Sequence, residues 1–160
     1  MKTKTITLYE FDELPTEKAK DRARDWWRTT SPQDDDYWWQ DIYEDAEQIG
    51  LKIKDFDLCG RTIEGKFIRE PDMVAHLILA NHGKHCATHM LATEYREACN
   101  KVFDERREAE AVDKAFLKDL CHEYLTMLLD SYDHFLSDEN VDELLRVNGC
   151  TFTEDGKRID

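Results

Sequence analysis

Apolar and polar residues follow two different periods at the start of the chain. Residues 3–11 alternate and are rich in β-branched and aromatic side chains, which predicts a β-strand. A helix follows, with Thr16 as the N-cap and Glu17 in the first turn. Its small and aromatic residues share one face and are Ala19, Ala23, Trp26 and Trp27. Arg24 falls on the opposite face, so we expect it to point into solvent.

A second helix is predicted to begin at Ser31 and Pro32, because serine caps a helix and proline suits its first position. Four residues of its apolar stripe should be buried: Trp38, Ile42, Ala46 and Ile49. Gly50 then supplies the left-handed residue at which a helix ends. Residues 51–58 and 61–68 are predicted to form a hairpin through Cys59 and Gly60, with a bulge near Lys54 and Asp55.

The rest of the chain is mainly helical. Helices are predicted over residues 71–81, from about Cys86 to Glu110, over residues 113–131, and after a cap at Ser137. The last ten residues fit a hairpin around Asp155 and Gly156. Together the elements predict a single α+β domain over residues 1–160. In it a small antiparallel sheet, made of the N-terminal strand, the central hairpin and the C-terminal hairpin, packs against about six helices.

The charge of the chain narrows the class of partner. The 160 residues include 22 basic and 36 acidic ones, and the net charge is −14. Such a surface repels phosphates, which argues against direct binding to nucleic acid. It favours a basic partner, such as a protein that itself binds nucleic acid. The alternative is that the charge serves solubility alone.

The cysteines and the hydropathy predict a compartment. Five cysteines occur, an odd number, and no two have CxxC spacing, which suits free thiols in a reducing cytosol. No apolar run approaches the length of a membrane span, and the polar first ten residues do not resemble a signal peptide. We therefore expect a cytoplasmic protein with no membrane partner. The sequence leaves the oligomeric state open.

Two long segments carry a resemblance. TLYEFDELPTEKAKDRARDWWR (residues 7–28) and YWWQDIYEDAEQIGLKIKDFDL (residues 37–58) resemble a family of small bacteriophage and prophage accessory proteins. NHGKHCATHMLATEY and the segment from Phe152 to Arg158 are also similar to that group. Its members are often labelled antitoxin of a toxin–antitoxin stability system. The resemblance implies an accessory protein made in the cytosol of a bacterial host and dispensable for virion assembly. It supplies no catalytic residues.

The outer face of the second predicted helix is the main candidate site. Its acidic residues include Asp34, Asp41, Glu44 and Glu47. A row of carboxylates of this kind can imitate spaced phosphates and occupy the basic groove of a nucleic-acid-binding protein, although a solvated helix face gives the same pattern. Tryptophans occur in adjacent pairs, so one ring of each pair can reach the surface. Trp27 and Trp39 are therefore candidate partner contacts.

A histidine-rich stretch offers weak candidates for a metal site. His82, His85, Cys86 and His89 lie within eight residues, and His85 and His89 would be one helical turn apart. Exposed polar histidines are the simpler interpretation, since no further ligands occur at a familiar spacing. The sequence contains no nucleotide-binding or hydrolase motif. We therefore expect no cofactor and no enzymatic activity.

These observations lead to one hypothesis and two alternatives. The hypothesis is a phage-encoded acidic protein that binds and blocks a host protein, as a counter-defence inhibitor of the anti-CRISPR or anti-restriction type would, by mimicking nucleic acid. The first alternative is an antitoxin-like regulatory partner that sequesters a basic toxin. The second is a metal-dependent module centred on residues 82–89.

Overall fold

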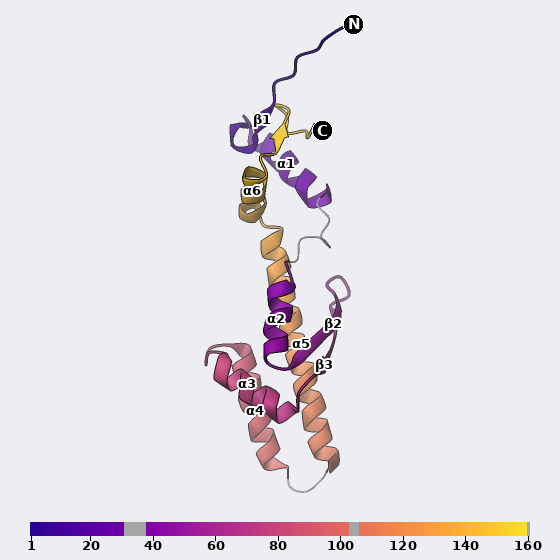
Figure 1. Ribbon diagram of the computed structural model, residues 1–160, viewed down its shortest axis with the longest axis vertical. Helices are drawn as coiled ribbons and strands as arrows, with labels where there is room; N and C mark the ends of the chain where they lie inside the picture. The colour runs from indigo at the N-terminus through magenta and orange to yellow at the C-terminus, as the bar shows by residue number, and fades with distance from the viewer. Residues whose placement is uncertain (31–37, 103–105, 160) are drawn as a thin grey trace. The chain divides into compact units, whose positions relative to one another are not determined.

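The computed structural model describes residues 1–30, 38–102 and 106–159 (Figure 1). The expected α+β class is confirmed, because helices and short antiparallel strands both occur. In chain order the elements are β1 (Tyr9–Glu10), the 3₁₀ helix η1 (Phe11–Glu13), α1 (Glu17–Thr30), α2 (Gln40–Gln48), β2 (Leu51–Asp57), β3 (Thr62–Phe67), α3 (Pro71–Asn81), α4 (Ala87–Lys101), α5 (Arg106–Phe135), α6 (Asp138–Val147) and β4 (Thr151–Phe152).

Contacts divide the chain into two compact units, which we describe separately. The terminal unit comprises residues 1–38 and 132–160, and the central unit comprises residues 39–131. The long helix α5 contributes to both units, since Tyr132 is one of its residues. The single domain over residues 1–160 stays a prediction.

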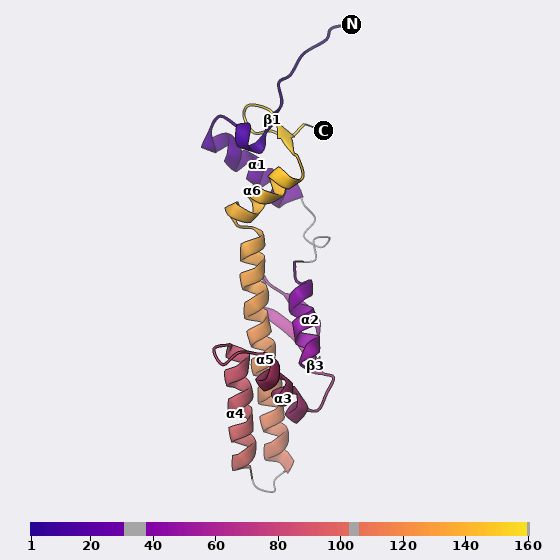
Figure 2. The same ribbon diagram turned by 60° about the vertical axis from the view of Figure 1, so that its left-hand side comes forward.

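The central unit is built on the β2–β3 hairpin. The two strands pair from Leu51 and Phe67 onward, and their register shifts between Ile53 and Asp55, which confirms the predicted bulge. Leu51 and Ile53 are buried in a core shared with α2, α3, α4 and α5. Figure 2 shows α4 lying beside the first half of α5. The hairpin packs closely on α5, because a Cβ atom at Gly65 would lie 2.9 Å from Sγ of Cys121.

The terminal unit joins segments from both ends of the chain. β1 pairs with β4, with Tyr9 opposite Phe152, and Phe152 also bridges to Arg158. The predicted caps are confirmed: the Ala19 N–H donates to Oγ1 of Thr16 over 3.1 Å, and the hydroxyl of Ser137 caps α6. The buried core of this unit consists of Phe11, Leu14, Ala19, Ala23, Val141, Leu145, Cys150 and Phe152.

The N-terminal strand is much shorter than the sequence predicts. Only Tyr9 and Glu10 pair with another strand, because β4 is itself two residues long, and residues 1–8 have no regular structure. The strands also form two separate two-stranded sheets, β1–β4 and β2–β3, in place of one sheet. The order of the strands along the chain is nevertheless as expected.

Two further expectations need correction. The helix expected from about Cys86 to Glu110 ends at Lys101, because Val102 adopts an extended conformation, and α5 begins at Arg106. Arg24 does not point into solvent: it is 9% exposed and buried in the terminal unit. Its position is explained by the carboxylate of Asp142 on α6, to which its guanidinium donates.

The apolar character of the helices and the state of the cysteines both bear on the expected compartment. No helix in the described ranges has both the length and the apolar character that crossing a bilayer requires. All five cysteines are free thiols, of which Cys121 and Cys150 are buried. Burial raises the pKa of the Cys121 thiol.

Candidate protein-binding face

Helix α2 is amphipathic, and its two faces differ in charge. Ala46 and Ile49 are fully buried, as predicted, whereas Trp38 and Ile42 are only half-buried. The reason is that α2 begins at Gln40, so Trp38 precedes the helix and its ring lies 5.1 Å from that of Tyr132. At the other end the chain turns at Gly50, whose φ of 91° confirms the predicted left-handed residue.

The outer face of α2 carries three exposed carboxylates, Asp41, Glu44 and Glu47. Residues three apart on a helix have Cβ atoms about 5–6 Å apart, so the three carboxylates form one row. The row carries one charge per about 4.5 Å of helix axis, against one phosphate per about 3.4 Å on each strand of B-DNA. The side-chain amide of Gln40 donates to Glu44 over 3.0 Å.

No lysine or arginine of the described residues forms a salt bridge with this row. The terminal unit differs, because several of its aspartates are paired with arginines. Arg28 contacts Asp138, Arg146 contacts Asp12, and their pairing holds the pKa of both carboxyl groups below the usual range. The α2 row therefore has no ion-pair partner among the residues that the structure describes.

The other predicted contact residues are divided between the units. Trp39 lies at the start of α2, half-buried, with its ring 4.7 Å from that of Tyr43. Trp27 belongs to the terminal unit, where it is half-buried and packs edge-on against Trp26 at 6.3 Å. Asp34 lies outside the described residues, as do Ser31 and Pro32. Trp39 thus belongs to the same unit as Asp41, Glu44 and Glu47, and Trp27 belongs to the other unit.

A chain of hydrogen bonds fastens the inner side of α2 to three other elements, and the sequence analysis did not predict it. The hydroxyl of Tyr124 on α5 donates to Oδ2 of Asp45 over 2.7 Å. The other oxygen of Asp45 lies 3.4 Å from Nε2 of His82 at the end of α3. Nδ1 of His82 lies 2.5 Å from the hydroxyl of Thr88 on α4.

The pKa shifts in this network have clear causes. Contact with His82, and then the hydrogen bond from Tyr124, lower the pKa of Asp45 despite partial burial. Burial, and then the neighbouring carboxylate, raise the pKa of Tyr124 far above its usual value. Asp45 is therefore ionised and Tyr124 neutral at physiological pH. The network holds α2 in place.

Thr88, His82 and Asp45 also have the residue types of a nucleophile, a base and an orienting carboxylate. Thr88 is fully buried, however, so a substrate cannot reach its hydroxyl. The arrangement is consequently suited to structure and not to nucleophilic catalysis.

The weak metal candidates are not brought together. His82 is held by Thr88 and Asp45, whereas His85 and Cys86 are exposed before α4 and His89 is half-buried on it. Within residues 1–30, 38–102 and 106–159, no group of three or more His, Cys, Asp or Glu side chains is arranged to hold a metal ion.

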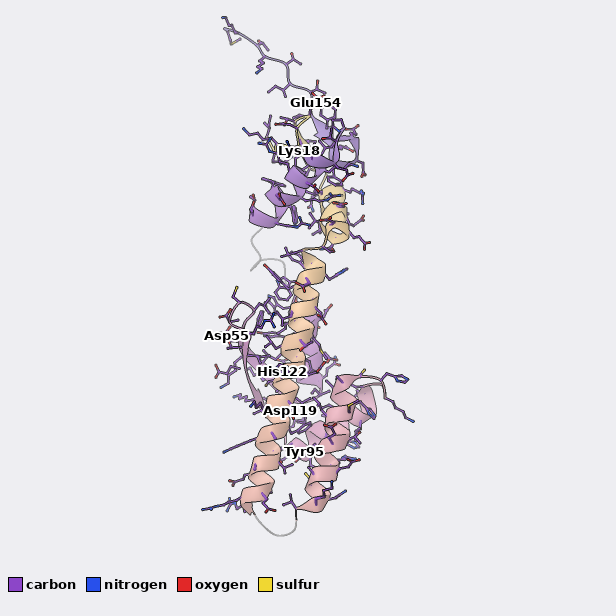
Figure 3. All side chains as sticks on the ribbon, turned by 180° about the vertical axis from the view of Figure 1, so that it is seen from behind. Lys18, Asp55, Tyr95, Asp119, His122 and Glu154 are labelled. Atoms are coloured by element: carbon purple, nitrogen blue, oxygen red, sulfur yellow. The ribbon has the colours of Figure 1, made fainter. Side chains whose placement is uncertain are left out.

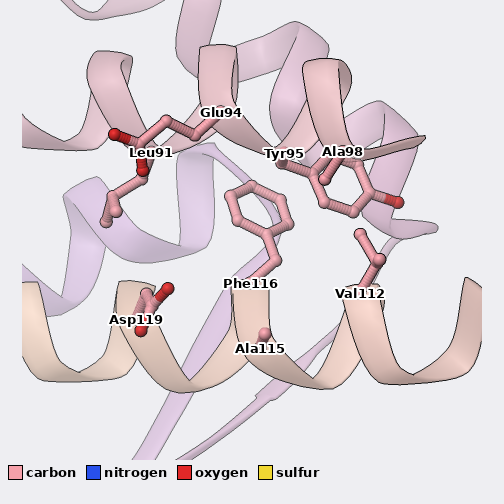
Figure 4. A pocket seen from close by; sticks show the side chains of 8 residues that line it. All are labelled: Leu91, Glu94, Tyr95, Ala98, Val112, Ala115, Phe116 and Asp119. Atoms are coloured by element: carbon pink, nitrogen blue, oxygen red, sulfur yellow. The ribbon is translucent and has the colours of Figure 1, made fainter. Parts of the chain in front are cut away.

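A small hollow lies between α4 and α5 (Figure 4). Tyr95 and Phe116 stack with centroids 4.3 Å apart, and the Tyr95 hydroxyl donates to Asp113 over 2.6 Å. The hollow has a volume of about 180 Å³, below the roughly 300–1,000 Å³ that is usual for small-molecule sites. It is better explained as a packing gap between two helices than as a substrate pocket.

A groove between β3 and α5 is lined by basic as well as acidic side chains, unlike the acidic row of α2. Its volume is about 520 Å³, and its lining includes Lys114, Lys118 and His122, which recur every four residues on α5. Asp119 lies on the same helix, close to His122 (Figure 3), so the charge of the groove is mixed. The groove shares no residue with the acidic row of α2.

Comparison of the chain with protein-family models, with curated proteins and with solved structures found no match.

Proposed function

We propose that this protein is a non-enzymatic binding protein that presents the acidic row of α2 to a basic surface of a host protein. The partner is a protein that normally binds nucleic acid, and the bound row blocks the surface that phosphates would occupy. In the setting that the family resemblance implies, the partner is a bacterial defence or nucleic-acid-processing protein, and the complex forms in the cytoplasm.

One observation supports this proposal above the others: Asp41, Glu44 and Glu47 are exposed in one row, and no lysine or arginine of the described residues forms a salt bridge with them. Like charges this close repel one another, so a row without counter-charges costs stability in the free protein. A basic partner would remove that repulsion on binding. Trp39 precedes the first turn of α2, is half-buried, and offers an apolar contact of the kind that often anchors an interface.

The net charge of the whole chain also favours a basic partner. A net charge of −14 attracts a basic partner over a distance and raises the association rate, more strongly at low salt. The same field repels nucleic acid itself. In this proposal the protein competes with nucleic acid for the partner and does not itself bind nucleic acid.

The test is differential capture from a bacterial lysate. Immobilised wild-type protein should retain a partner that double-stranded DNA displaces, because both ligands need the same lysines and arginines. The triple variant Asp41→Lys, Glu44→Lys, Glu47→Lys should lose that partner. The matched control is Glu97→Lys, Glu108→Lys, Asp130→Lys, which makes the same charge change at three exposed helical positions of the described chain.

The outcome distinguishes the α2 row from charge in general. Equal loss of the partner in both triple variants would show that net charge alone attracts it. Retention by the α2 variant, or indifference to DNA and to salt, would reject nucleic-acid mimicry and favour an apolar interface around Trp39.

A further inference from the structure

The segment from Lys4 to Glu10 has the sequence pattern of a β-strand, but most of it is not paired with another strand. Its residues alternate as KTITLYE, and threonine, isoleucine and tyrosine favour extended structure. Residues 4–8 nevertheless pair with nothing in the described chain. Ile6 and Leu8 are 49% and 46% exposed, and both point to the same side of an extended segment.

The sheet to which this segment leads has an open edge. β4 lies between β1 and the bridge at Arg158, so β1 is the outermost strand of this sheet in the described residues. An open edge presents unpaired N–H and C=O groups that can pair with another chain. The sheet of the terminal unit can therefore be extended only on the side of β1 or beyond Arg158.

The segment is complementary to itself in one register. Antiparallel pairing about Thr7 sets Ile6 opposite Leu8 of a second copy and Lys4 opposite Glu10. Thr5 then faces Tyr9, a β-branched residue opposite an aromatic one, which is a favourable cross-strand pair. Each of these pairs occurs twice, as a two-fold axis requires, and Thr7 faces Thr7 of the other copy once, on the axis.

Other registers lack this match. Pairing about Ile6 would put Lys4 opposite Leu8, and pairing about Leu8 would put Ile6 opposite Glu10. A shift of one residue would set Ile6 opposite Thr7 and mix the apolar and polar faces. The charges and the aliphatic side chains thus select the register centred on Thr7.

We propose that residues 4–10 form an antiparallel strand with the same residues of a second copy, joining the β1–β4 sheets of two chains into one sheet. The occupant of the open edge is a second copy, because the segment complements itself: Lys4 faces Glu10 and Ile6 faces Leu8. The proposal does not depend on the function proposed for α2.

Cysteine cross-linking tests both the pairing and its register. In a protein whose exposed Cys59, Cys86 and Cys99 are replaced by serine, Thr7→Cys should form a disulfide-linked dimer under mild oxidation. The two Cα atoms would be about 4.5–5.5 Å apart, within the range of a disulfide. Thr5→Cys is the matched control, since its two copies would be about 13 Å apart. Equal cross-linking of the two variants, or none with Thr7→Cys, would overturn the register.

Charge exchange tests the pairing without a covalent bond. Light scattering over a concentration series should give twice the chain mass of 18.9 kDa for the wild type. Lys4→Glu or Glu10→Lys alone should raise the dimer dissociation constant about tenfold, because each changes two symmetry-related pairs. The double variant Lys4→Glu, Glu10→Lys should restore the dimer.

Lys18→Glu serves as the control, because Lys18 is an exposed lysine of the same unit (Figure 3) and lies outside the segment. Circular dichroism of each variant checks that the fold is retained. A wild-type protein that stays monomeric up to about 1 mM, the weakest affinity of interest, would refute the proposal. So would a double variant that is no better than the single ones.

Discussion

Arg24 on α1 donates to both carboxylate oxygens of Asp142 on α6, from Nε over 2.7 Å and from Nη2 over 2.9 Å. A third bond, from Nη1 to Asp21, is 2.7 Å long. The side chains of Arg24 and Asp142 are 10% and 15% exposed, so this is the most protected ion pair among the described residues of the terminal unit. The bond to Asp142 raises the pKa of Arg24 above its already high value, and the guanidinium is always charged.

Replacing Arg24 by alanine should destabilise the protein by about 3 kcal/mol, because Asp142 would keep its charge at a site with little solvent. Arg22→Ala is the control, since its pair with Asp155 is more than half exposed and should contribute much less than the Arg24 pair. Urea unfolding at neutral pH measures both. Equal losses in the two variants would show that burial of the Arg24 pair has no energetic effect.

Gly156→Ala should prevent normal packing of the C-terminal turn. A Cβ atom at Gly156 would lie 2.0 Å from the carbonyl oxygen of Ala19, and the residue has a φ of 84°. We expect the free energy of unfolding to fall by more than about 3 kcal/mol. The added Cβ atom would clash with the backbone of α1, which can shift less than a side chain can. Gly149→Ala is the control: its φ is 59° but nothing lies within 4 Å. It should cost only about 1–2 kcal/mol of backbone strain, and thermal unfolding would separate the two.

Gly65→Ala should destabilise the central unit through a contact with one side chain. The added methyl group would lie 2.9 Å from Sγ of Cys121, so a smaller residue at position 121 should relieve the contact. The double variant Gly65→Ala, Cys121→Ala should therefore be more stable than the sum of the two single losses predicts. Additive losses in urea unfolding would mean that the backbone of β2, 3.3 Å away at Lys52, causes the strain instead.

Asp45→Asn should lower the stability of the protein at pH 7 but not at low pH. The pKa of Asp45 is lower in the folded protein than its ordinary value of 3.8. Its ionised form therefore contributes stability in full above about pH 4, and the contribution is lost as the pH falls through the folded pKa. We expect a cost of about 1 kcal/mol at pH 7, because the carboxylate is 44% exposed. The difference from wild type should shrink toward pH 3.

Asp41→Asn is the control for this experiment. It makes the same change on the same helix but removes no hydrogen bond to Tyr124 or His82. Denaturant unfolding at a series of pH values would compare the variants. A cost of Asp45→Asn that is constant with pH would show that the carboxylate's charge does not stabilise α2.

Local signals predicted several helix boundaries correctly, but not the end of α4 or either end of α5. Thr16 and Ser137 cap helices through their own hydroxyl groups, and Gly50 adopts the conformation that glycine favours, so each is decided within a few residues of sequence. The β-bulge between Ile53 and Asp55 could also be predicted, because the alternation of β2 changes phase there.

Long-range contacts could not be predicted in this way. Arg24 meets a carboxylate 118 residues further along the chain, and Tyr124 meets Asp45 across 79 residues. Nothing next to these residues in the sequence distinguishes them from ordinary polar positions. The periodicity of α1 placed Arg24 outside, but an arginine can lie in a core when a carboxylate receives its charge.

The acidic row followed from periodicity alone, because Asp41, Glu44 and Glu47 lie opposite the buried Ala46 and Ile49. What periodicity could not supply is the charge environment of the row. Whether an acid on a helix has a cationic neighbour depends on packing, and here no lysine or arginine of the described residues forms a salt bridge with the three carboxylates.

The bonds from Asp45 to Tyr124 and His82 have a consequence for any partner that contacts α2. They fix the helix from its inner side, so its backbone loses conformational freedom when the protein folds and not when a complex forms. Ordering a loose helix at the moment of binding would subtract from the affinity. Here the backbone of α2 has already lost its conformational entropy on folding, so a partner binds carboxylates whose spacing is fixed in the free protein.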